Sequence, residues 1–91
     1  MEHVRKVVGD LEFSAGSSER GPDWCALWID EGAQDTIGEE RFAELPDRLA
    51  AALGLPADSV LWEDRELLLV RAPVTSPRGV LDALVALVEL P

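Results

Sequence analysis

The stretch Trp24-Cys25-Ala26-Leu27-Trp28-Ile29 decides the fold, because all six of its residues are apolar. A strand without polar positions is typical of one covered on both faces. We therefore expect residues 24–29 to form a strand at the centre of a sheet or beneath a partner.

Residues 7–13, on the N-terminal side, alternate with the period of two that indicates a half-buried strand. Gly9-Asp10 is also a candidate for a two-residue hairpin turn, which would divide this segment into two strands. We favour a single strand with a bulge at Gly9. Residues 14–22 are dense in Gly, Ser and Pro, and are predicted to form a connecting loop.

A helix is predicted after the acidic connection at residues 30–35. Thr36 followed by Glu39 has the spacing of a capping box. Pro46 should kink or restart the helix, and Gly54 is a plausible C-cap. The apolar positions Phe42, Leu45, Leu49 and Leu53 share one face of this helix.

The C-terminal third predicts a hairpin and a second helix. Residues 59–63 and 66–71 have the pattern of two strands joined by a turn at Asp64-Arg65. Ser76 is a suitable N-cap and Pro77 a suitable first helical residue, for a helix that runs to about Glu89.

The predicted order is β-β-α-β-β-α over a single domain, residues 1–91. Hairpins followed by helices favour an antiparallel sheet with helices on one face. The predicted class is therefore a two-layer α+β fold with about four strands and two helices.

The chain carries a net charge of −10, of which residues 30–66 carry −8. Such a surface repels phosphates and anionic lipids, so we expect no direct binding of nucleic acid or membrane. The N-terminal residues lack the apolar core of a signal peptide and only one cysteine is present, so a cytoplasmic location is expected. High Ala, Leu, Val and Arg content with a single Lys is typical of a GC-rich bacterial genome.

Residues suited to catalysis are few. His3 is the only histidine and stands near the N-terminus, and Cys25 is expected to be a buried, unreactive thiol. One Cys and one His do not make a zinc site. We expect no cofactor, no metal and no enzymatic activity; an enzyme using carboxylates of the acidic segment with a metal is the least favoured class.

Binding to a protein is the favoured function. Helices on one sheet face leave the other open, where either Trp24, Ala26 and Trp28 or Cys25, Leu27 and Ile29 would be exposed. We predict Trp24, Trp28 and Trp62 as apolar anchors of a self-associating, homodimeric interaction domain.

The alternative is an acidic inhibitor or immunity-type protein that occupies a basic, nucleic-acid-binding site on another protein. Carboxylates would then stand in for phosphates, and salt would weaken the complex steeply. The predicted contact residues are Asp30, Glu31, Asp35, Glu39, Glu40 and Glu44.

Overall fold

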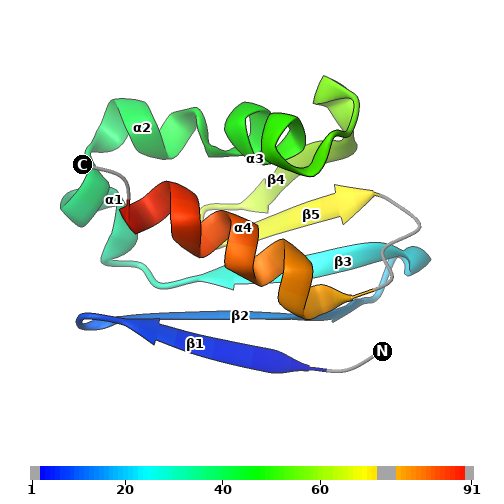
Figure 1. Ribbon diagram of the computed structural model, residues 1–91, viewed down its shortest axis with the longest axis horizontal. Coiled ribbons are helices and arrows are strands. Elements are labelled where there is room, and N and C mark those ends of the chain that lie inside the picture. The colour runs from blue at the N-terminus through cyan, green and yellow to red at the C-terminus, as the bar shows by residue number, and fades with distance from the viewer. Residues whose placement is uncertain (1–2, 72–75, 90–91) are drawn as a thin grey trace.

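The computed structural model describes residues 3–71 and 76–89, which form an antiparallel sheet with helices on one face. Figure 1 shows α3 and α4 on the same side of the sheet. The predicted α+β class is confirmed, but the described residues form five strands and four α-helices rather than four and two. The strands are β1 Val4–Val8, β2 Leu11–Ser18, β3 Gly21–Ile29, β4 Val60–Asp64 and β5 Leu67–Arg71. The helices are α1 Ala33–Ile37, α2 Glu39–Ala43, α3 Leu45–Leu53 and α4 Pro77–Glu89, with a short 3-10 turn η1 at Ala57–Ser59.

The order of the strands across the sheet is β1-β2-β3-β5-β4, and every neighbouring pair is antiparallel. The predicted central place of residues 24–29 is confirmed, because β3 is the middle strand. Its partners are the N-terminal hairpin on one side and the β4–β5 hairpin on the other.

The N-terminal segment corrects two predictions. Residues 7–13 are not a single strand, because Gly9 adopts a φ of 60° and turns the chain between β1 and β2. Residues 14–22 are mostly strand rather than loop: β2 continues to Ser18, and Gly21 begins β3. Pairing with β3 organises this Gly- and Ser-rich segment, which local composition had indicated to be irregular. The predicted order β-β-α-β-β-α is therefore wrong.

Three short helices replace the single helix predicted after residue 35. Thr36 lies inside α1, where its hydroxyl donates a 3.0 Å hydrogen bond to the carbonyl of Gly32 rather than capping a new helix. Gly38, with a φ of 94°, separates α1 from α2. Pro46 lies in the first turn of α3, and Gly54 ends α3 in the left-handed conformation, as predicted.

The C-terminal predictions are confirmed with small shifts. The β4–β5 turn lies at Arg65-Glu66, one residue later than expected. The Ser76 hydroxyl accepts a 3.4 Å hydrogen bond from the backbone N–H of Gly79, and α4 runs from Pro77 to Glu89.

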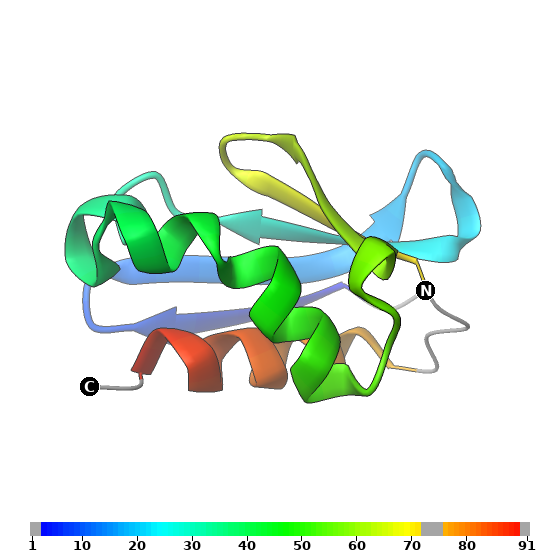
Figure 2. The same ribbon diagram turned by 90° about the horizontal axis from the view of Figure 1, so that it is seen from above.

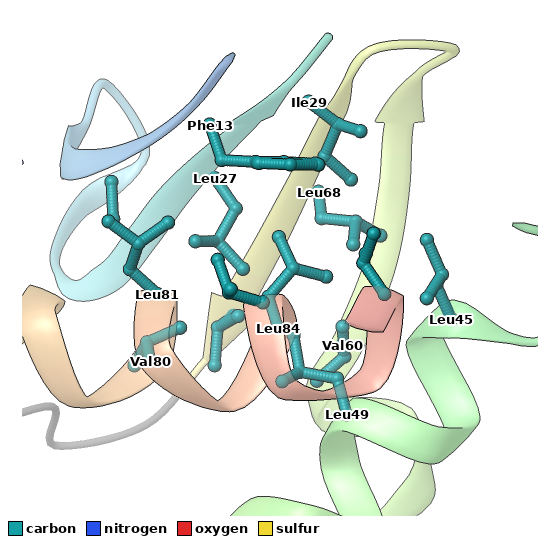
Figure 3. Close-up of a cluster of buried hydrophobic side chains, with 14 of the residues drawn as sticks. Phe13, Leu27, Ile29, Leu45, Leu49, Val60, Leu68, Val80, Leu81 and Leu84 are labelled. Carbon is teal, nitrogen blue, oxygen red and sulfur yellow. The ribbon is translucent and has the colours of Figure 1, made fainter. Parts of the chain in front are cut away.

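The hydrophobic core fills the space between the sheet and the helices (Figure 3). Leu84 of α4 and Leu49 of α3 are fully buried, as are Phe13, Leu27 and Leu68 of the sheet. None of the described helices packs on the opposite face of the sheet. No helix of the described residues is long and apolar enough to cross a membrane.

Candidate interaction surface

The face of the sheet that points away from the helices is called here the open face. Alternate residues of a strand point to opposite faces, so the strand register determines which side chains lie there. One row across the sheet joins Ser14 of β2, Trp28 of β3 and Leu67 of β5. The next joins Gly16, Ala26 and Leu69, and continues to Leu61 of β4.

Trp28 is the main exposed aromatic residue of this face, with 40% of its surface accessible. The edge of its ring contacts the ring of His3, with centroids 5.6 Å apart and planes at 78°. The His3 ring lies over Gly16, where a Cβ atom would come within 2.7 Å of His3 Cδ2. Glycine at position 16 thus allows His3 to pack toward Trp28.

Trp24 lies on the same face, four residues before Trp28, and is partly buried. The Arg20 guanidinium stands 5.0 Å from the centre of its indole ring, and that of Arg71 stands 5.8 Å away. Both distances fall within the range of a cation–π contact. Trp24 is therefore partly covered by its own chain, whereas Trp28 presents a larger exposed surface.

A hollow of about 400 Å³ lies on the open face between the β2–β3 turn and the β4–β5 hairpin. Its floor includes Ala26, Leu67 and Leu69, and Trp28 also lines it. Figure 2 shows both hairpin turns rising on the side of the sheet away from α4. Arg20 and Glu63, 3.1 Å apart, join the two hairpins beside this hollow.

The charges on the open face nearly balance, although the chain as a whole carries −10. Its basic residues are Arg5, Arg20 and Arg71, and its acidic residues are Glu12, Glu19, Glu63 and Asp64, the last of which is paired with Leu67. Arg5 and Glu12 form a further exposed ion pair at 3.2 Å. The open face is therefore a nearly neutral surface on a strongly acidic protein.

Trp62 is not brought to the open face. It pairs with the buried Leu68 on the side of the helices and stacks on Phe42 of α2, with centroids 4.9 Å apart. Its neighbours Leu61 and Glu63 point to the open face instead. The structure thus brings together two of the three predicted tryptophan anchors, Trp24 and Trp28.

The predicted acidic contact residues lie around α1 and α2. Both oxygens of Asp30 accept backbone hydrogen bonds, from Gly32 at 2.9 Å and from Glu12 at 3.0 Å. These bonds, that of Gly32 first, lower the pKa of the Asp30 carboxyl. Glu44 pairs with Arg48 at 2.8 Å. The remaining four carboxylates, of Glu31, Asp35, Glu39 and Glu40, are exposed.

The residues considered for catalysis are placed apart from one another. Cys25 is fully buried on the side of the helices, and this burial raises the pKa of its thiol, while a backbone hydrogen bond from Gly16 acts in the opposite direction. Within residues 3–71 and 76–89, no three His, Cys, Asp or Glu side chains gather closely enough to hold a metal ion.

Sequence reasoning missed the contribution of β4 and β5 to the open face. Leu61 and Leu67 extend the apolar surface beyond β3, whereas Leu69 between them is only 2% exposed. The alternation within residues 59–71 indicated that successive side chains point to opposite faces of the sheet. Predicting which of them lie on the open face required knowing that β5, rather than β4, pairs with β3.

No family model, no curated protein and no solved structure matches this chain.

Proposed function

We propose that this chain is a non-catalytic protein-interaction domain that associates with a second copy of itself through the open face. The observation that carries the proposal is the exposure of Trp28 in the centre of the sheet, beside a hollow with an apolar floor. Large aromatic residues next to such hollows are typical anchors of protein interfaces.

The charge distribution favours a second copy as the partner. Two chains of −10 repel each other over most of their surfaces. The open face carries nearly as many basic as acidic residues, so two copies meet there with little repulsion. Two-fold homodimers are also the most common soluble oligomers.

The size of the open face predicts a weak, reversible dimer. Five strands about 4.8 Å apart, each with about five paired residues at 3.3 Å per residue, give a projected area of roughly 400 Å². Stable interfaces bury about 800 Å² of accessible surface on each partner. Because the core lies on the other side of the sheet, the monomer should remain folded after dissociation.

Sedimentation over a concentration series tests this proposal. The expected result is a monomer–dimer equilibrium with a dissociation constant of about micromolar order, unweakened at high salt because added ions screen the repulsion. Trp28→Ala should shift the equilibrium to monomer. A wild-type protein that remains monomeric at all concentrations would overturn self-association.

A second candidate is the acidic inhibitor of a basic protein. Glu31, Asp35, Glu39 and Glu40 favour it, because all four carboxylates are exposed within ten consecutive residues. Complex formation with a basic nucleic-acid-binding protein should then weaken steeply with salt. Glu39→Gln together with Glu40→Gln should weaken that complex and leave the self-association constant unchanged, whereas an unchanged or salt-insensitive complex would contradict this candidate.

A further inference from the structure

We infer that the open face is complementary to itself across a two-fold axis that runs along β3. This inference rests on the proposed self-association and adds the arrangement of the two copies. It follows from the unequal sizes of the side chains on the two sides of β3.

The β5 side of the open face is bulky and the β2 side is small. In the row through Trp28, Leu67 lies on β5 and Ser14 on β2. In the next row, Ala26 and Leu69 are only 2% exposed and the His3 ring covers Gly16, so that row offers no contact to a partner. The exposed row through Trp28 therefore has a leucine on one side of the central strand and a small residue on the other.

A two-fold axis along β3, lying between the facing sheets, exchanges these two sides. Leu67 of one copy then lies over Ser14 of the second copy, and the reciprocal contact forms at the same time. The strands of the two sheets run within about 30° of each other, as in aligned sheet packing.

An axis across the strands gives a poorer fit. Passing through the row of Trp28, it would place Leu67 opposite Leu67 of the second copy, and Ser14 opposite Ser14. Large side chains would then meet large ones while small residues face each other across a gap, and closely packed interfaces avoid both.

The charges at the sheet edges agree with the axis along β3. Arg5 on β1 flanks Ser14, and Asp64 on β4 is paired with Leu67 at the opposite edge. Exchange of the two sides brings Arg5 of each copy toward Asp64 of the other. Opposite charges thus meet at both outer edges of the dimer.

Exchange of the large and the small residue tests this arrangement. Ser14→Leu places two leucines against each other, and Leu67→Ala leaves a gap, so each should raise the dimer dissociation constant about tenfold. The double variant S14L/L67A restores one large and one small residue at every such contact. It should recover dimerisation to within about threefold of the wild type.

The control is Ala86→Leu, which adds the same kind of side chain at an exposed position of α4, away from the open face. It should leave the dissociation constant unchanged, and circular dichroism should show that all four variants are folded. A wild-type dimer with no recovery in S14L/L67A would overturn the axis along β3 while self-association stands. A strictly monomeric wild type would overturn both proposals.

Discussion

The Arg20 guanidinium, in the turn between β2 and β3, donates a 3.1 Å hydrogen bond to the carboxylate of Glu63 on β4. This contact joins two hairpins across 43 residues of sequence, beside the hollow of the open face. The two side chains are 46% and 44% exposed, so water and salt screen their attraction. The geometry of the hairpins must therefore come from the strand pairing beneath them.

Glu63→Gln removes this ion pair while keeping the size of the side chain. Because exposed pairs contribute little, we expect a loss of about 0.5 kcal/mol in the free energy of unfolding, measured by urea denaturation. The matched control is Glu44→Gln, which removes the exposed Glu44–Arg48 pair and should have a similar effect. A loss above about 2 kcal/mol for Glu63→Gln alone would contradict the minor role of this contact.

Trp28 and Trp62 should respond to substitution in opposite ways. Trp62 is partly buried, stacks on Phe42 and packs against the core, so Trp62→Ala should cost about 2 kcal/mol of stability and leave self-association unchanged. Trp28→Ala should cost less than about 1 kcal/mol and abolish self-association. Urea denaturation and sedimentation of both variants measure the two effects, and equal loss of association in both would contradict the assignment of faces.

The sequence pattern identified β3, the β4–β5 hairpin and α4 because each has a strong local signal. Six apolar residues marked the centre of the sheet, and Ser76 with Pro77 marked the start of α4. These secondary-structure preferences come from residues adjacent in the sequence, and the tertiary contacts of the folded chain agree with them.

The N-terminal hairpin could not be predicted from local sequence preferences. Ser14 and Gly16 have low strand propensity, and β2 extends through them because β3 lies beside them and supplies hydrogen-bond partners. Likewise, the sequence marked Trp62 as a large aromatic residue but did not show which face it occupies. That depends on the pairing of Trp62 with Leu68, a contact on the side of the helices.

Gly54 and Gly79 should give opposite results when changed to alanine. Gly54 ends α3 with a φ of 70° and a ψ of 30°, where a Cβ atom is strained, so Gly54→Ala should lower stability by about 1 kcal/mol. Gly79 lies within α4 with no atom near its missing Cβ, so Gly79→Ala should raise stability by about 0.5 kcal/mol. Thermal unfolding of both variants checks the signs, and a stabilised Gly54→Ala would contradict the left-handed cap.

Asp30 should give the protein a stability contribution that disappears in acid. Hydrogen bonds from the backbone N–H groups of Gly32 and Glu12 lower the pKa of its carboxyl in the folded state. A lowered folded pKa means that the contribution is fully present above the unfolded aspartate value of about 3.9. It is lost as the pH falls through the lower folded value, because the carboxyl is then protonated in both states.

Asp30→Asn tests this linkage. The variant should be less stable than the wild type at neutral pH, and the difference should shrink as the pH falls below about 4. Asp35→Asn removes the same charge from an exposed position of α1. Its effect on stability shows what the lower net negative charge contributes, and the rest of the Asp30→Asn effect belongs to the hydrogen bonds of Asp30. Urea denaturation at a series of pH values measures both variants. A stability difference for Asp30→Asn that stays constant down to pH values well below 4 would show that these hydrogen bonds do not favour the charged carboxylate.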